Sequence, residues 1–228
     1  MTTEAKPLPA PLWGVGSFRV GDQMPAYAVS QDDHGRDIST AMKAVASLGL
    51  QKKKRALVLS MLSEAAQYWP VQIALLVSKA QFSLADASRF DAFRTAMFLR
   101  AMQYDVVLGI NTDVLDGLDD LGHAYADIFA KVPVLSARAG AYERLRDAGL
   151  SPRWWLHVGP TVAVECDQLQ GAHVDGDEWE LDSERGEVLI SARKPRAATI
   201  DRLHTAVQGE IVTEVCACGR SDPRVIPQ

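Results

Sequence analysis

Hydrophobic positions in the middle of the chain alternate between helical and strand spacing. After Asp37, apolar residues recur every three or four positions, which predicts a helix that ends at Gly49. The short apolar run that follows, 55–61, is typical of a buried strand. The same reading predicts helices over 64–79, 87–103, 111–130 and 139–148, and strands over 81–84, 105–110, 132–136 and 154–158. Strands that alternate with helices in this way are typical of parallel β-α-β units.

This alternation stops after Gly159. Short extended runs then follow one another, separated by Gly, Asp, Lys and Pro, which favours an antiparallel, strand-rich end. The extended runs are 161–165, 178–181, 187–191 and 210–215. At the other end, Pro and Gly interrupt the first thirty or so residues. The sequence therefore predicts an irregular segment over 1–36, an α/β core with a mostly parallel sheet flanked by helices over 37–158, and a smaller antiparallel β subdomain over 159–228.

Composition narrows the classes of function. The chain has 228 residues, of which 47% are hydrophobic and 23% are charged, as expected for a globular protein. Its net charge of −5 argues against nucleic-acid binding, which needs Lys and Arg to neutralise phosphates. No stretch reaches the roughly 18 uninterrupted apolar residues of a membrane helix, and the polar, Pro-rich start lacks a secretory signal pattern. We therefore expect a cytoplasmic protein that binds neither nucleic acid nor membrane.

All three cysteines lie in the strand-rich end together with a histidine. They form the pairs Cys166-x6-His173 and Cys216-x-Cys218, and no cysteine is left over. Thiolates and an imidazole are the ligands that zinc prefers, and four protein ligands leave no open position for a catalytic water. These residues therefore predict a structural Zn²⁺ site. The alternative is three unrelated buried cysteines and a surface histidine.

The segments around these residues resemble a known family. Residues 159–166 read Gly-Pro-Thr-Val-Ala-Val-Glu-Cys and are followed by Gly171-Ala172-His173. Residues 186–190 read Gly-Glu-Val-Leu-Ile, and residues 216–224 read Cys-Ala-Cys-Gly-Arg-Ser-Asp-Pro-Arg. These motifs, in this order, resemble the phenylacetate–CoA ligase family of the adenylate-forming superfamily, over roughly 25–224. The resemblance implies a pocket for an aryl or acyl carboxylate.

The chain departs from this family where ATP would bind. In place of a Ser/Thr/Gly-rich phosphate loop, residues 18–25 read Phe-Arg-Val-Gly-Asp-Gln-Met-Pro. The family's Tyr-Gly-x-[Ser/Thr]-Glu turn is missing between Val158 and Gly159, and Val207 stands where the family has a ribose-binding Asp. The family also extends beyond both ends of the chain and carries a catalytic Lys in its C-terminal domain. ATP-dependent adenylation by this chain alone is therefore not expected, and no nucleotide-binding residue is assigned.

One histidine remains as a candidate pocket residue. His157 follows two tryptophans at the end of a predicted strand, where ligands bind in α/β folds. It either lines a pocket or is a packed, hydrogen-bonded side chain.

We expect a catalytically degenerate binding or accessory subunit that forms a homodimer or joins a heteromeric complex. The alternative is a divergent enzyme that reuses the carboxylate or CoA-thioester pocket for a non-adenylating reaction.

Overall fold

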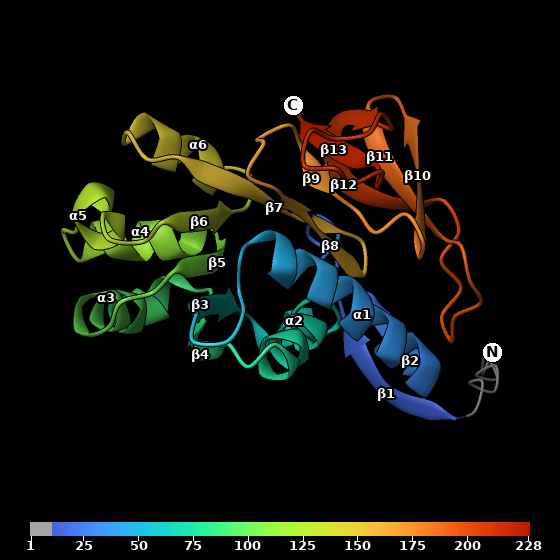
Figure 1. Cartoon of the computed structure of the whole chain (residues 1–228), viewed down its shortest axis with the longest axis horizontal. Coiled ribbons are helices and arrows are strands. Elements are labelled where there is room, and N and C mark those ends of the chain that lie inside the picture. The colour runs from blue at the N-terminus through green and yellow to red at the C-terminus, as the bar shows by residue number, and fades with distance from the viewer. Residues whose placement is uncertain (1–10) are drawn as a thin grey trace, which may run out of the picture.

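The computed structural model describes residues 11–228, and its largest feature is one eleven-stranded sheet (Figure 1). One end of this sheet is parallel, with the strand order β4-β3-β5-β6-β7. Its strands are β3 (Arg55–Ser60), β4 (Gln81–Asp86), β5 (Val106–Ile110), β6 (Val134–Ala137) and β7 (Pro152–Val158). The central strands are short apolar runs, because both faces of a parallel sheet are covered by helices.

Helices cover both faces of the parallel strands. Ala56 and Val58 of β3 face a cluster formed with α1 and α2, whereas Leu57 and Leu59 face a cluster formed with α3 to α6. The helices are α1 (Gln31–Ser47), α2 (Ala65–Val77), α3 (Ala92–Ala101), α4 (Thr112–Asp120), α5 (Tyr125–Phe129) and α6 (Ala141–Asp147), with short 3₁₀ turns η1 (Leu62–Glu64) and η2 (Arg89–Asp91). The predicted α/β fold class is confirmed.

The antiparallel end continues the same sheet. From β7 the strand order runs β8-β9-β13-β12-β11-β10, and every pair is antiparallel. These strands are β8 (Thr161–Glu165), β9 (Ala172–His173), β10 (Trp179–Glu184), β11 (Glu187–Ala192), β12 (Leu203–Val212) and β13 (Arg224–Pro227). Val158 pairs with Thr161, so Gly159 and Pro160 alone form the turn between β7 and β8. The parallel and antiparallel parts are therefore joined by a tight hairpin.

The expected irregular start is wrong for residues 12–30. β1 (Leu12–Ser17) and β2 (Ala26–Ser30) form a two-stranded antiparallel sheet, and Phe18 packs edge-to-face on Tyr27 at 5.6 Å between ring centroids. The first helix starts at Gln31 rather than Asp37. The Ser30 hydroxyl accepts a hydrogen bond from the Asp33 backbone N–H, and the Asp33 carboxylate accepts one from the Ser30 N–H. This capping box fixes the helix start. Residues 1–10 of the predicted segment lie outside the described part.

Several other predicted boundaries are also wrong. The helix expected over 111–130 is two helices, since α4 ends at Asp120 and Gly122 takes a left-handed φ of 69° before α5 begins. The strand expected over 210–215 instead runs from Leu203 to Val212.

Asn111 caps α4 through its side chain, which accepts a hydrogen bond from Val114 N–H at 3.0 Å. No helix within residues 11–228 is long and apolar enough to cross a bilayer.

Arg196 joins the antiparallel end to the first helix. Its guanidinium lies over the Trp179 ring at 4.2 Å from the centroid and contacts Asp37 at 2.8 Å and Glu178 at 3.3 Å. The Arg196 side chain is fully buried, so both carboxylates are needed to compensate for its lost hydration. This contact holds the antiparallel strands against α1.

Because β5 packs closely against α2, we expect Gly109 not to tolerate a side chain. Gly109 has a φ of 81°, and a Cβ there would collide with the Tyr68 hydroxyl and lie 2.5 Å from the Leu59 carbonyl oxygen. Gly109→Ala is therefore expected to lower the free energy of unfolding by about 3 kcal/mol or more in denaturant titrations. Gly122→Ala is the control, because Gly122 has a φ of 69° but no atom within 4 Å of the added Cβ. It should cost about 1–2 kcal/mol. Equal losses would contradict the steric argument.

Candidate metal centre

Strand pairing brings the four predicted metal ligands together. Cys166 directly follows β8, and His173 lies on β9, which pairs with β8. Cys216 and Cys218 lie in the connection between β12 and β13. β13 pairs with β9, so Arg224 lies opposite His173 and the connection is drawn toward the histidine. Two chain segments about forty residues apart thus meet at one point because four strands are neighbours in the sheet.

The distances within this cluster suit a tetrahedral metal ion. The ligand atoms of Cys166, His173, Cys216 and Cys218 all lie within 4.8 Å of one another. The Sγ atoms of Cys166 and Cys216 are 3.7 Å apart, and Cys218 Sγ lies 3.6 Å from His173 Nε2. Zinc–sulfur bonds of about 2.3 Å and zinc–nitrogen bonds of about 2.0 Å give sulfur–sulfur edges of about 3.8 Å and sulfur–nitrogen edges of about 3.5 Å in a tetrahedron. The four residues could therefore bind a metal ion.

Local backbone geometry aims the side chains at this centre. Gly219 has a φ of 86°, and its N–H donates to the Cys216 carbonyl at 2.8 Å, which closes the Cys-Ala-Cys turn. The loop between Cys166 and His173 turns through Leu169 and Gly171, with φ values of 52° and 100°. A side chain at Gly171 would lie 3.0 Å from the Val225 carbonyl, so glycine allows β13 to approach.

Two buried charged residues hold the ligand loops in place. The Arg224 guanidinium donates to the Gln170 carbonyl at 2.9 Å and to the Glu214 carbonyl at 3.1 Å, and so joins the two ligand-bearing loops. The Glu165 carboxylate accepts hydrogen bonds from the N–H groups of Gly171 and Trp154, each at 3.0 Å. Sequence reasoning did not assign these roles to Arg224 and Glu165, although both residues lie in the quoted motifs. Their contacts fix the loops from outside the ligand set.

Burial shifts the protonation of the residues in this cluster. Burial lowers the pKa of His173 to about 4, so its imidazole is neutral and has a lone pair to donate. Burial raises the pKa of Cys166 to about 12. Burial also acts to raise the pKa of Cys216, but hydrogen bonds from the Cys218 backbone and side chain outweigh it, and this pKa lies below its ordinary value. A bound cation would stabilise all three thiolates in a place where burial otherwise disfavours charge.

The other candidate, His157, belongs to a buried polar cluster at the carboxyl ends of the parallel strands. Arg138 follows β6 and donates to both carboxylate oxygens of Glu64, at 2.7 and 2.8 Å. Arg138 also donates to the Tyr68 hydroxyl at 2.8 Å. His157 Nε2 lies 3.3 Å from that hydroxyl, and His157 Nδ1 lies 4.0 Å from Glu64. The cluster unites α2, η1 and the ends of β6 and β7.

Burial and neighbouring charge keep His157 neutral. Burial lowers its pKa well below 6.5, and the positive charges of Arg138 and Arg19 lower it further. Burial also raises the pKa of Tyr68 to about 12, so its hydroxyl stays protonated. The His157 side chain is 10% exposed and contacts protein groups on both ring nitrogens. The geometry is that of a hydrogen-bonded core residue, and a role for His157 in ligand binding stays a prediction.

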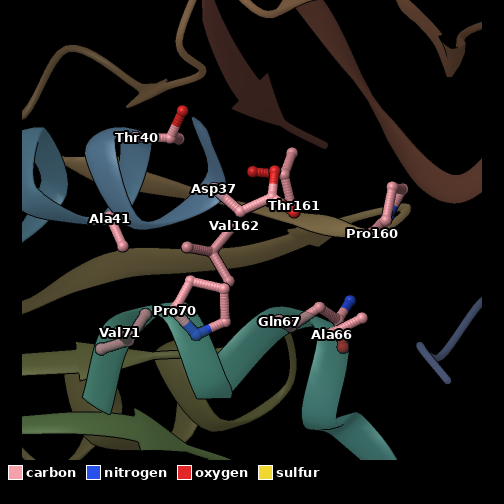
Figure 2. Close-up of a pocket in the computed structure, with 10 residues that line it drawn as sticks. All are labelled: Asp37, Thr40, Ala41, Ala66, Gln67, Pro70, Val71, Pro160, Thr161 and Val162. Atoms are coloured by element: carbon pink, nitrogen blue, oxygen red, sulfur yellow. The ribbon is translucent and has the colours of Figure 1, made fainter. Parts of the chain in front are cut away.

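The cavity between α1, α2 and β8 is too small for a carboxylate ligand (Figure 2). Its volume is about 10 Å³, which is room for one water molecule, whereas small-molecule sites usually occupy about 300–1,000 Å³. Gln67 donates to the Gly159 carbonyl at 2.7 Å beside it, and so supports the turn between β7 and β8. A second cavity of about 150 Å³ lies between Tyr68, Trp69 and Leu84.

Comparison with solved structures identifies the architecture. An open conformation of 2-hydroxyisobutyryl-CoA ligase, in complex with 2-HIB-AMP and CoA, matches with a TM-score of 0.72 and 14% identity over 94% of this chain and 56% of that one. E. coli MenE with bound OSB-AMS matches with a TM-score of 0.56 and 10% identity, over 95% and 48%. A putative long-chain-fatty-acid CoA ligase from Rhodopseudomonas palustris matches with a TM-score of 0.55 and 14% identity, over 94% and 58%.

The chain has the fold of adenylate-forming CoA ligases. It spans about half the length of the ligases it matches, between 48% and 58% for these three structures. No protein-family profile matches the sequence, and no curated protein matches it. At identities of 10–14%, the likeness extends to the fold and not to activity or substrate.

The buried state of His157 predicts a pH dependence of stability. Because its pKa is lowered in the folded protein, the unfolded chain binds a proton below about pH 6.5 that the folded chain does not bind. His157 should therefore lower the free energy of unfolding by up to about 1.4 kcal/mol for each pH unit below 6.5. His157→Gln should flatten this slope in urea titrations between pH 7 and pH 5.

His204→Gln is the matched control, because His204 is an exposed histidine on β12. It should change the slope less than His157→Gln does. If the free energy of unfolding of the His157→Gln variant changed between pH 7 and pH 5 as it does in the wild-type protein, a buried, neutral His157 would be contradicted.

Proposed function

We propose that the protein is a zinc-binding, catalytically degenerate relative of the phenylacetate–CoA ligase branch of adenylate-forming enzymes. In this proposal it acts in the cytoplasm as a binding or accessory subunit and does not adenylate a carboxylate. The shared fold and the motifs around Cys166 and Cys216 support the relationship. The proposed ligand class, an aryl or acyl carboxylate, follows from the resemblance alone.

The turn between β7 and β8 is the observation that carries the proposal. The resemblance places the family's Tyr-Gly-x-[Ser/Thr]-Glu segment here, which stacks on adenine and offers a carboxylate near Mg²⁺. In this chain Val158 pairs directly with Thr161, and only Gly159 and Pro160 lie between them. Gly159 is enclosed, because an added Cβ would lie 3.0 Å from Ile190 and 3.1 Å from Leu203. The loop that would hold the nucleotide is thus replaced by a closed hairpin.

The segment that aligns with the phosphate loop also supports the loss of ATP chemistry. Phe18 is buried, whereas a phosphate loop keeps its backbone N–H groups open toward the ligand. Val20 and Gln23 donate their N–H groups to each other's carbonyls, both at 2.9 Å, so neither is free to bind phosphate. Asp22 adds an exposed carboxylate that would repel a phosphate. Val207, at the place of the ribose-binding Asp, packs against the apolar cluster of the antiparallel strands.

The choice of zinc rests on donor chemistry. Three thiolates and one imidazole suit Zn²⁺ better than Mg²⁺ or Ca²⁺, which prefer oxygen ligands. The four side chains would occupy all positions of a tetrahedral ion and leave none for a reacting water. The ion would therefore stabilise the loops around β9 and β13 rather than act on a substrate.

Metal content tests the zinc proposal. Protein purified without chelator should carry about one zinc per chain by elemental analysis. Cys166→Ser and Cys216→Ser should each lose most of this zinc. Removing the metal should lower the midpoint of thermal unfolding by roughly 10 °C, since several kcal/mol of metal-coupled folding energy are lost.

Val215→Ala serves as the control for these variants. Val215 is exposed and adjoins Cys216, but it offers no ligand atom, so this variant should keep its zinc. Wild-type protein without zinc, or a Cys166→Ser variant with unchanged zinc content and thermal stability, would refute the site.

The lost-adenylation proposal is tested by nucleotide binding and by exchange. Isothermal titration with ATP and Mg²⁺ should give no binding at micromolar ATP concentrations. No carboxylate should promote exchange of labelled pyrophosphate into ATP above background. A 2-hydroxyisobutyryl-CoA ligase assayed with its own acid under the same conditions is the positive control. Tight ATP binding, or exchange that depends on an added carboxylate, would overturn this part of the proposal and leave the zinc site unaffected.

A further inference from the structure

The sheet has two edge strands, and they differ in character. β10 and β4 end the sheet, and no strand within residues 11–228 pairs with their outer sides. β10 carries exposed carboxylates at Glu180, Asp182 and Glu184, and charge of this kind discourages pairing with another chain. β4 is uncharged from Gln81 to Ala85. Its outward N–H and C=O groups over residues 82–85 are therefore an unprotected pairing edge, whereas the Asp86 N–H donates to the Asp91 carboxylate.

Exposed apolar side chains lie on both helices that contact this edge. On α2, Trp69, Ile73 and Leu76 follow one another at helical spacing, and Trp69 and Leu76 are exposed. On the other face of the sheet, Phe93 and Met97 of α3 are exposed. Figure 1 shows α2, β4 and α3 together along the lower side of the molecule. Exposed apolar residues that gather along one edge of a sheet favour an interface, whereas single exposed apolar residues do not.

We propose that β4 pairs antiparallel with β4 of a second copy of this chain and forms a symmetric homodimer. Another copy of the chain offers both a free edge strand and helices with exposed apolar residues on both faces of its sheet. A two-fold axis perpendicular to the sheet places α2 beside α2 and α3 beside α3. Such an interface uses the same surface on both copies and closes after two.

Charges at the two ends of β4 favour this arrangement. Lys79 and the Arg55 guanidinium, which donates to the Gln81 side chain at 3.0 Å, lie at its amino end. Asp86 and Asp91 lie at its carboxyl end, where Asp91 accepts the Asp86 N–H at 2.8 Å. Antiparallel pairing puts the basic end of each copy beside the acidic end of the other, whereas parallel pairing would align like charges. The ends thus select a second copy in the antiparallel direction.

Leu84 places an apolar side chain near the middle of the new contact. It lies on β4, lines the cavity beside Trp69, and so faces the α2 side of the sheet. In the dimer, Leu84 of each copy lies close to the two-fold axis. This surface shares no residue with the metal centre, so the inference is independent of the proposed function.

Sedimentation equilibrium of the wild-type chain tests the proposal. Wild-type protein at tens of micromolar should have twice the chain mass of 24.9 kDa. Leu84→Lys should weaken the dimer at least tenfold, because it buries two ammonium groups near the axis. Leu121→Lys is the matched control, since Leu121 is 43% exposed and Leu84 is 42% exposed, and Leu121 ends α4 away from β4. Circular dichroism and thermal unfolding establish that both variants are folded.

Hydrogen exchange gives a readout that needs no substitution. Amides of residues 81–86 should exchange more slowly at high than at low protein concentration, whereas those of residues 179–184 on the other edge should not change. A wild-type mass of 24.9 kDa, or a dimer that Leu84→Lys leaves intact, would overturn the proposal. A different protein bound to this edge on a chain that does not self-associate would overturn it as well.

Discussion

The two-residue turn between β7 and β8 determines how the antiparallel half is built. β7 ends the parallel strands, and the turn at Gly159 sends β8 back along it at once, with all five β8 side chains buried. Burial on both faces fixes the register, because a shift by one residue would exchange the two faces of the strand. Gln67 of α2 holds the turn through the Gly159 carbonyl. Each later strand is then added to an edge whose position is already set.

The same hairpin connects the metal cluster with the proposed loss of a nucleotide site. It leaves no loop at the place where the resemblance puts the adenine-binding turn. It also delivers Cys166 to the end of β8, beside His173 on β9. Arg224 then draws the Cys216–Cys218 loop onto the same point by binding the carbonyls of Gln170 and Glu214. The antiparallel strands thus keep the ligase fold and carry a cluster that could bind a metal ion. In the proposed function this ion fastens the strands while the site for ATP is closed.

Much of this arrangement could be predicted from local sequence, and the errors have physical causes. Short apolar runs bounded by Gly and Asp predicted the parallel strands, because burial on both faces leaves a strong pattern. The capping box of Ser30 and Asp33 was present in the sequence, but the Pro and Gly residues before it favoured an irregular segment, so the helix start was predicted too late. The two-residue strand β9 is too short for any periodicity, and tertiary pairing alone defines it.

The metal cluster could be predicted from the sequence, whereas the polar cluster around His157 could not. Cysteines and histidines are chemically distinctive, so the four residues of the metal cluster could be grouped before their positions were known. Glu64 and Arg138 are 74 positions apart and follow different strands, so no local pattern relates them. Their pairing depends on the sheet topology, because β3, β5 and β6 are parallel and their carboxyl ends therefore lie together at one end of the sheet. The neutral state of His157 follows from its burial and from the nearby charges of Arg138 and Arg19, and the sequence therefore could not reveal it.

X-ray absorption at the zinc edge of the purified protein tests directly whether the cysteine and histidine cluster binds zinc. We expect a four-coordinate ion with three sulfur atoms at about 2.3 Å and one nitrogen atom at about 2.0 Å, contributed by Cys166, Cys216, Cys218 and His173. A first shell made only of oxygen and nitrogen atoms, or one with a bound water in place of a sulfur, would contradict it.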